Sequence, residues 1–246
     1  MYRYQILIEY VGTKFIGWQK QEKGKSIQKE IENNLSKLLK QKIIIYGSGR
    51  TDAGVHAIEQ SAHFDVKNKV QNIDKIVKSL NFFLNSKMIS IIKIRRKSIS
   101  FHARYSAKER IYLYIIQNRF APSALNKNRE WHIRKKLDIK LIKKGSKKLI
   151  GTHDFSTYRA SNCGSKSPIR TINKISVSKT KNIIKLKFKS KSFLKNQVRS
   201  MVGCLKYLGE GKWDLKKFEA VFIKKDRKKV APPAPACGLY LEKIIY

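Results

Sequence analysis

The sequence lacks the long hydrophobic runs that would place it in a membrane. None of its apolar stretches approaches the ~20 residues that a transmembrane helix requires. The first residues, Met1–Gln5, do not have the layout of a secretory signal. We therefore expect a cytoplasmic protein without a membrane anchor.

Cysteine is also rare, with three residues far apart at Cys163, Cys204 and Cys237. No Cys-x-x-Cys pair occurs, and the five histidines are similarly scattered. Disulfide frameworks and zinc sites need such residues at short, regular spacing. The sequence therefore predicts neither a disulfide scaffold nor a metal site, and it leaves the roles of the three cysteines open.

Acidic residues are scarce: 17 Asp and Glu stand against 55 Lys and Arg in 246 residues, which gives a formal net charge of +38. A chain this basic is expected to bind a polyanion, and nucleic acid is the first candidate. A compositional drift toward lysine, asparagine and isoleucine would raise the charge in the same way. The arginines carry more weight, because the planar guanidinium suits phosphates and bases.

Short basic runs are candidate phosphate contacts, although many lysines in such runs are simply solvated. These runs are Lys93–Lys97, Arg134–Lys136, Lys143–Lys144, Lys147–Lys148 and Lys224–Lys229.

Apolar periodicity divides the chain into two stretches with the same order of elements. In the first, it predicts strands at 2–10, 43–46, 61–66 and 88–94 and helices at 27–39 and 73–84. In the second, it predicts strands at 110–117, 171–178, 183–189 and 238–245 and helices at 138–149, 194–208 and 215–223. Each stretch has the order β-α-β-β-α-β, with one short extra helix in the second.

This repeated order predicts an α+β protein of two ferredoxin-like β-α-β-β-α-β halves, with mixed antiparallel sheets flanked by helices. We expect residues 1–105 to form the N-terminal half and residues 106–246 the C-terminal half, with the active-site cleft between them. The duplication is inferred from element order alone, since the halves show no visible sequence identity.

Ten residues, Gly47–His56 (GSGRTDAGVH), differ from the rest of the chain. Their three glycines allow positive φ or close approach of a ligand, which predicts a tight loop between strands. Asp52 lies at its centre, and Arg50 supplies a fixed positive charge. A loop held by strands at both ends positions a catalytic group well. On spacing alone, an ordinary turn with Asp52 as an Asx-turn or N-cap residue is the commoner explanation.

Seven motifs follow one another along the chain. They are EYxGTxFxGWQ at 9–19, GRTDAGVH at 49–56, FHAR at 101–104, RxYxY at 110–114, GxHDF at 151–155, NQVRxMVG at 196–203 and APAxGLYL at 234–241. With these motifs in this order, the chain resembles the tRNA pseudouridine synthase A family over nearly its whole length.

The resemblance implies an isomerase that converts uridine to pseudouridine at nucleotides 38, 39 and 40, in the anticodon stem and loop of tRNA. It implies Asp52 as the nucleophile, Tyr112 against the target uracil, and Arg50 and Arg199 serving the site. The motifs add His56, Arg104, Arg110 and Leu241 as substrate-binding candidates. The resemblance further implies tRNA as the partner, a homodimer, and no metal or organic cofactor.

The reaction itself agrees with an aspartate nucleophile. It breaks the bond from N1 of uracil to the ribose, turns the base and joins C5 to the same carbon, without oxidation. An ionised carboxylate can attach to the base or the sugar meanwhile, and a close guanidinium keeps it ionised. Arg199, beside the apolar stripe of its predicted helix, is the candidate for that guanidinium. The alternative is a surface arginine on an amphipathic helix.

The target uridine must leave the stacked helix before it reacts. Stacking on an aromatic side chain restores roughly 1–3 kcal/mol. Tyr112 suits this task, and its hydroxyl could move the proton that leaves C5. Tyr114 points to the same face of the predicted strand, and a core position is the alternative for both. Packed loop residues are likewise the alternative to RNA contact for His56 and His102.

Two other functions fit parts of the sequence. A non-catalytic RNA-binding protein agrees with the charge and the paired halves. A metal-dependent hydrolase or phosphotransferase would use Asp52 with a bound ion, but it needs a second carboxylate, and the nearest in sequence are Glu59 and Asp65.

Overall fold

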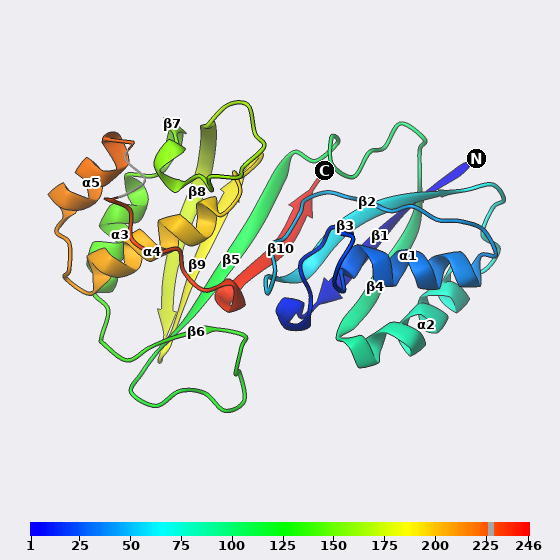
Figure 1. Cartoon of the computed structure of the whole chain (residues 1–246), viewed down its shortest axis with the longest axis horizontal. Coiled ribbons are helices and arrows are strands. Elements are labelled where there is room, and N and C mark those ends of the chain that lie inside the picture. Colours follow the sequence, from blue (N-terminus) through cyan, green and yellow to red (C-terminus); the bar gives the residue numbers. More distant parts are fainter. Residues whose placement is uncertain (226–228) are drawn as a thin grey trace. The chain divides into compact units, whose positions relative to one another are not determined.

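A computed structural model describes residues 1–225 and 229–246 of the chain (Figure 1). The chain forms two compact units. Unit 1 consists of Met1–Lys108 and Tyr240–Tyr246, and unit 2 consists of Glu109–Leu239. The division predicted from the sequence differs in that it placed the last strand with the second half.

Unit 1 contains the predicted helices and strands of the first stretch. They are β1 (Tyr2–Tyr10), α1 (Ile27–Leu38), β2 (Tyr46–Gly47), β3 (His56–Val66), α2 (Ile73–Leu84) and β4 (Ile89–Lys97), with 3₁₀ turns at Gly12–Lys14 and Asn85–Lys87. The last strand, β10 (Leu239–Ile245), adds to the same sheet. Strand β2 is shorter than expected and β3 begins five residues earlier than expected.

The sheet of unit 1 has β1 between β4 and β3, and both pairs are antiparallel. Strand β2 pairs antiparallel with β3, and β10 pairs parallel with it, which places Tyr240 opposite His56 and Leu241 opposite Ala57. The parallel pairing explains why residues 240–246 belong to unit 1. The order β4-β1-β3-β2 agrees with a ferredoxin-like half, and the predicted α+β class is confirmed.

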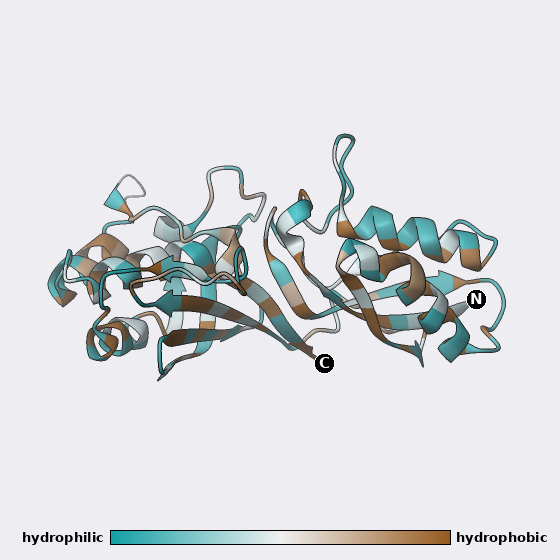
Figure 2. Ribbon diagram, turned by 90° about the horizontal axis from the view of Figure 1, so that it is seen from below, coloured by the Kyte–Doolittle hydropathy of each residue, from teal (hydrophilic) through white to brown (hydrophobic). Residues whose placement is uncertain are grey.

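Alternate residues of β1 line one buried face of the sheet. Tyr4, Ile6 and Ile8 are at most 1% exposed. The Ser26 side chain accepts the backbone N–H of Lys29 at the start of α1, and the Asn72 side chain accepts that of Lys75 at the start of α2. Hydrophobic and hydrophilic residues alternate along the helices and strands in Figure 2, as expected for elements that bury one side.

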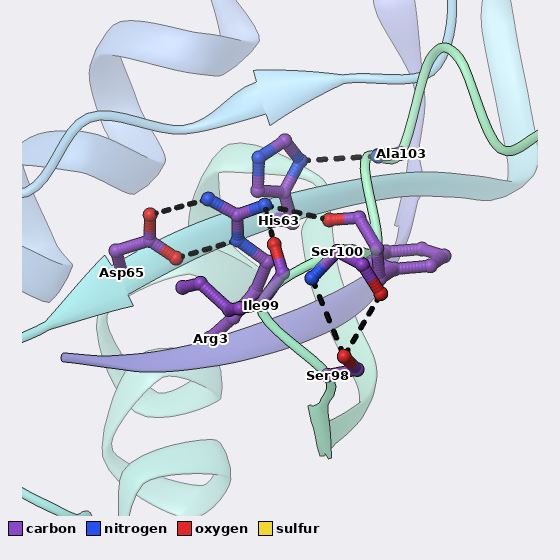
Figure 3. A network of polar contacts seen from close by, with 8 residues as sticks. Arg3, His63, Asp65, Ser98, Ile99, Ser100 and Ala103 are labelled. Carbon is purple, nitrogen blue, oxygen red and sulfur yellow. Dashed lines mark hydrogen bonds and ion pairs between the residues drawn. The ribbon is translucent and has the colours of Figure 1, made fainter.

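On the other face of this sheet, the segment Ser98–Ser106, here called the strap, covers polar side chains (Figure 3). The Arg3 guanidinium binds both carboxylate oxygens of Asp65, at 2.8 and 2.7 Å. Its Nη1 donates to the carbonyl oxygens of Ile99 and Phe101, at 2.6 and 2.8 Å. The pair fastens the strap to the sheet, and the arginine holds the pKa of Asp65 below its usual value.

His63 holds the strap at a second point, because its Nδ1 accepts the backbone N–H of Ala103 at 3.2 Å. The hydroxyl of Tyr246 donates to the carbonyl of Ala103 at 2.9 Å and is hydrogen-bonded to Ser61 Oγ at 2.7 Å. His63 is only 1% exposed. Burial, followed by the charge of Arg3, lowers its pKa to about 4.

The low pKa of His63 predicts a specific acid sensitivity. In the unfolded chain the imidazole has a pKa of about 6.5, so below that pH the unfolded state gains a proton that the folded state takes up only near pH 4. The free energy of unfolding should therefore fall by roughly 2 kcal/mol from this residue between pH 7 and 4.5. Urea titrations of wild type and His63→Gln at the two pH values measure it. Equal pH dependence of the two proteins would contradict the prediction.

Unit 2 contains the second set of elements. They are β5 (Glu109–Asn118), β6 (Trp131–Ile133), α3 (Ile139–Lys147), β7 (Gly151–Asp154), β8 (Ile169–Thr180), β9 (Ile183–Ser190), α4 (Gln197–Gly209) and α5 (Leu215–Ile223), with 3₁₀ turns at Ser156–Tyr158 and Ala236–Gly238. Its sheet has the order β5-β9-β8-β7 with antiparallel pairs, and β6 pairs parallel with β5. Strands β6 and β7 were not expected, because they are too short to show alternation.

Helix α4 begins at Gln197, three residues later than expected. Asn196 before it adopts a left-handed conformation, with φ of 64°. The side chain of Gln197 accepts the backbone N–H of Leu194 at 2.8 Å, so the preceding residues form a turn. Helices α3 and α4 pack closely, since a Cβ on Gly145 would lie 2.4 Å from Leu208 Cδ2.

The helices found in residues 1–225 and 229–246 include none long and apolar enough to cross a membrane. The predicted basic run Lys224–Lys229 lies partly outside the described residues, at 226–228.

Candidate active site

Asp52 lies in a tight turn between β2 and β3 and is partly exposed. Its backbone carbonyl accepts the N–H of Val55 at 3.1 Å, and Gly54 takes a φ of +76° to close the turn. The preceding residue, Thr51, is buried, and its hydroxyl is hydrogen-bonded to that of Tyr10 at 2.7 Å. The turn presents Asp52 while its neighbour is anchored in the core.

The segment Gly12–Trp18, here called the brace, lies against this turn. The N–H of Trp18 donates to the carbonyl of Thr51 at 3.1 Å, and Gly17 forms an antiparallel bridge with Asp52. The brace continues into α1, because the N–H of Ile27 donates to the carbonyl of Gly17. The Asp52 turn is thereby connected to the helix layer through backbone atoms.

Two glycines make the close approach of the brace possible. A Cβ on Gly12 would lie 2.0 Å from the carbonyl oxygen of Val55. Gly17 has a φ of +117°, and a Cβ there would lie 2.6 Å from the carbonyl oxygen of Thr51. Residues of the motif at 9–19 therefore support the loop of the motif at 49–56. The sequence did not reveal this contact between the two motifs.

His56 and Leu241, both expected to bind substrate, are buried with exposed fractions of 1% and 0%. Nδ1 of His56 accepts the N–H of Gly12 at 2.9 Å, and its ring packs against Tyr240 with centroids 4.7 Å apart. These contacts favour the packed, hydrogen-bonded interpretation of His56. Leu241 likewise packs as a core residue of β10 and presents no surface to RNA.

The two arginines of unit 1 that were expected to contact substrate are both exposed. Arg50 precedes the Asp52 turn, two residues before the carboxylate. Arg104 lies in the strap, where its guanidinium carbon is 5.6 Å from the ring centre of Tyr105. The structure thus places Arg50 and Asp52 on one loop, His56 at the start of β3 directly after it, and Arg104 on a separate segment of the same unit.

Strand β5 of unit 2 separates the two tyrosines that the sequence could not distinguish. Tyr114 is fully buried, and its hydroxyl donates to the carbonyl of Pro235 at 2.8 Å. Burial raises its pKa well above the usual value. Tyr112 is partly exposed and packs edge-to-face with Phe193, at 5.1 Å between centroids. Tyr114 is therefore the core residue, and Tyr112 retains surface for a ligand.

Arg199 lies in the first turn of α4 and is partly exposed. Its Nε donates to the carbonyl of Ala234 at 2.7 Å, and its Nη1 donates to Asn196 Oδ1 at 3.3 Å. The N–H of Ala234 returns a bond to the carbonyl of Arg199 at 3.0 Å. These acceptors are neutral, so they orient the guanidinium without cancelling its charge. Arg110, also in unit 2, donates to the carbonyl of Lys191.

Residues 1–225 and 229–246 contain no group of three or more His, Cys, Asp or Glu side chains arranged to hold a metal ion.

A sequence model of a family described as tRNA pseudouridine synthase matches residues 6–106 and 146–246, most of the chain. The chain belongs to the tRNA pseudouridine synthase family. The matched ranges include both the Asp52 turn and Arg199, whereas Tyr112 lies between them.

Three relatives of the same family are similar over nearly their full lengths. They are the tRNA pseudouridine synthase A proteins of Pelagibacter ubique (strain HTCC1062), 63% identical over 246 residues with both chains covered completely; Neorickettsia sennetsu (strain ATCC VR-367 / Miyayama), 44% identical over 244 residues, 99% of this chain and 100% of the relative; and Paramagnetospirillum magneticum (strain ATCC 700264 / AMB-1), 42% identical over 246 residues, 100% of this chain and 96% of the relative.

Membership in the tRNA pseudouridine synthase family confirms the resemblance seen in the motifs. The protein is an isomerase that converts uridine to pseudouridine in tRNA. This excludes the purely RNA-binding protein and the metal-dependent hydrolase as its main function.

Proposed function

We propose that the protein modifies nucleotides 38, 39 and 40 in the anticodon stem and loop of tRNA and that Asp52 is its nucleophile. The observation that supports Asp52 as the nucleophile is its partly exposed carboxylate, on a turn that is fixed at Thr51 and braced at Gly17. A nucleophile must be accessible to the nucleoside and held in one position, and this turn satisfies both needs.

The roles of the other residues follow from their surroundings. Arg199 is oriented by neutral oxygens, so its guanidinium keeps its positive charge for the reaction. Tyr112 has exposed ring surface on which a flipped uracil stacks. Arg50, exposed beside the turn, fills the gap left by the flipped base or holds a neighbouring phosphate.

In the reaction, a carboxylate oxygen of Asp52 bonds to the nucleoside, at uracil C6 or ribose C1′. The bond between N1 and C1′ breaks, the base turns, and C5 bonds to C1′. In the C1′ case the bond to Asp52 breaks as C5 bonds to C1′, and a base then removes the proton from C5. In the C6 case a base removes the proton from C5 and the bond from C6 to Asp52 breaks with it. Every atom of the uridine is retained, so the chain's own groups suffice for the bond changes.

A homodimer in the cytoplasm is the proposed working form. A net charge of +38 on a chain of this size suits a large RNA surface, and a second subunit extends that surface. Sedimentation of the complex with tRNA measures the number of subunits. A complex that contains a single subunit would contradict this part of the proposal.

Mapping the product nucleotide by nucleotide tests the proposed target. In an unmodified tRNA transcript with uridines at 38, 39 and 40, we expect carbodiimide labelling and primer extension to stop at these positions and not at uridines elsewhere. The matched control is the same transcript with cytidines at the three positions, which should give no stop. Stops at other uridines, or equal labelling of both transcripts, would refute the proposed position.

A further inference from the structure

The loop that leads into the Asp52 turn is held at alternate residues. The carbonyl oxygen of Gly49 accepts a hydrogen bond from Nε2 of Gln60 at 2.9 Å, and Gln60 is fully buried. Thr51 is also buried, whereas Arg50 before it is exposed and Asp52 after it is partly exposed. Burial thus alternates as it does along a strand, where successive side chains point to opposite sides. The core holds residues 49 and 51, and the side chains of residues 50 and 52 are turned toward solvent.

Thr51 is held through both its side chain and its backbone. Its hydroxyl is hydrogen-bonded to that of Tyr10 at 2.7 Å, and its carbonyl accepts the N–H of Trp18 at 3.1 Å. The rings of Tyr10 and Trp18 are both buried, with centroids 6.1 Å apart. The indole also lies against Gly47, where a Cβ would meet Trp18 Nε1 at 2.5 Å. The residue that precedes Asp52 therefore has a defined orientation.

Strand β1 directs Tyr10 at this loop. Its register with β3 is regular up to Ile8 and then shifts, so that Ile8 pairs with Gln60 and Tyr10 with Ala57. A shift of this kind bends the strand and changes the direction of the side chains beside it, and such irregularities recur next to active sites. Tyr10 comes directly after the shift, and its hydroxyl meets Thr51.

Stability alone does not account for a buried pair of hydroxyls. Each hydroxyl loses its water on burial, and the bond between them restores little more than that cost. Phenylalanine in place of Tyr10 and valine in place of Thr51 would fill the same space, and apolar pairs of the same shape are nearly as stable. The apolar pair lacks direction, because hydrophobic contact is non-directional whereas a hydrogen bond fixes the orientation of both groups.

We propose that Tyr10 is a positioning residue for the isomerisation: through its bond to Thr51 it fixes the direction of the adjacent Asp52 carboxylate. Tyr10 itself is only 2% exposed, so it acts through Thr51 and not on the substrate. The inference rests on the proposed role of Asp52 as the nucleophile. Without the bond, Asp52 takes additional orientations and reacts more slowly. The surface that binds tRNA stays the same, so the rate falls while the affinity does not.

Single-turnover tritium release and equilibrium binding of tRNA test the proposal on the same variants. Tyr10→Phe keeps the ring and removes the hydroxyl. We expect release to slow about 10- to 100-fold, the scale of a misplaced catalytic group, with the dissociation constant within about twofold of wild type. Thr51→Val should show the same split between rate and affinity. Thr51→Ser keeps the hydroxyl and should react nearly as fast as wild type.

Tyr4→Phe is the matched control. Tyr4 lies on the same strand, is 1% exposed, and its hydroxyl accepts the N–H of Val70 at 3.0 Å. This bond does not involve the Asp52 turn, so Tyr4→Phe should react at the wild-type rate. Urea unfolding measures how much stability each lost bond costs. Similar losses of stability, with slow release in Tyr10→Phe alone, separate positioning from a general weakening of unit 1.

The double variant Tyr10→Phe/Thr51→Val tests whether the two hydroxyls act together. Once one is removed, the other no longer orients the loop, so the double variant should be no slower than the slower single variant. Losses that multiply would show that the two residues act independently, which contradicts the proposal.

The proposal is overturned if Tyr10→Phe releases tritium at the wild-type rate, if Tyr4→Phe is equally slow, or if the loss appears as weaker binding of tRNA. Asp52→Asn, measured alongside, keeps this result apart from the proposed function. An inactive Asp52→Asn with a normal Tyr10→Phe refutes the positioning role alone, whereas normal release from Asp52→Asn refutes the nucleophile itself.

Discussion

Replacement of Asp52 by asparagine is expected to abolish pseudouridine formation while the protein still binds tRNA. The amide has nearly the same size, so the turn that holds it, closed by Val55 and anchored at Thr51, is retained. The amide is a poor nucleophile, and removal of a covalent nucleophile lowers turnover by about 10⁴-fold or more. Tritium release from tRNA labelled at uracil C5, followed with excess enzyme, measures the loss directly.

Glu59→Gln is the matched control for this prediction. Glu59 is the next carboxylate along the chain and is also partly exposed, so the substitution removes the same charge nearby. We expect its rate to stay within about threefold of wild type, the scale of a lost surface charge. Equal losses in both variants would show that the effect is electrostatic, and normal release from both Asp52→Asn and Asp52→Ala would refute Asp52 as the nucleophile.

The sequence predicted helices better than strand partners. The bounds of α2 and α5 agree with the periodicity, because an amphipathic face is a local property of consecutive residues. Strand β10 showed the expected alternation, but alternation does not identify the neighbouring strand. Its pairing with β3 therefore appeared only in the structure.

The site residues show the same limit. The motif located Asp52, since a glycine-rich loop with one central carboxylate is visible in the sequence. It did not show that His56 is buried, because a histidine beside such a loop fits RNA contact and packing equally. The choice between Tyr112 and Tyr114 depended on Pro235 and Gly238, which lie more than a hundred residues away in sequence.

The brace was invisible for a different reason. Its contacts to the Asp52 turn use backbone atoms of Gly12, Gly17 and Trp18, so no pattern of side chains in the sequence predicts these contacts. The glycines at 12 and 17 were recognisable only as loop residues. Their function is to be small enough for one backbone to lie against another.

The brace leads to the second large expected effect: Gly12→Ala should lower the rate of tritium release by about 100-fold or more. The new Cβ would lie 2.0 Å from the carbonyl oxygen of Val55, and backbone on both sides leaves no flexible group to yield. The Asp52 turn must therefore move, and displacement of a catalytic group by about 1 Å costs on the order of 10²-fold in rate. The bond from the Gly12 N–H to His56 is strained by the same shift.

Gly164→Ala is the control, because a Cβ on Gly164 meets no atom within 4 Å. It should be neutral or slightly stabilising, by up to about 1 kcal/mol, since alanine restricts the unfolded chain. Urea unfolding separates the two ways in which Gly12→Ala can act: a folded variant with a slow rate shows that the turn is displaced, whereas a large loss of stability shows that the brace also holds unit 1 together. A variant with both normal stability and normal rate would mean that the brace does not position Asp52.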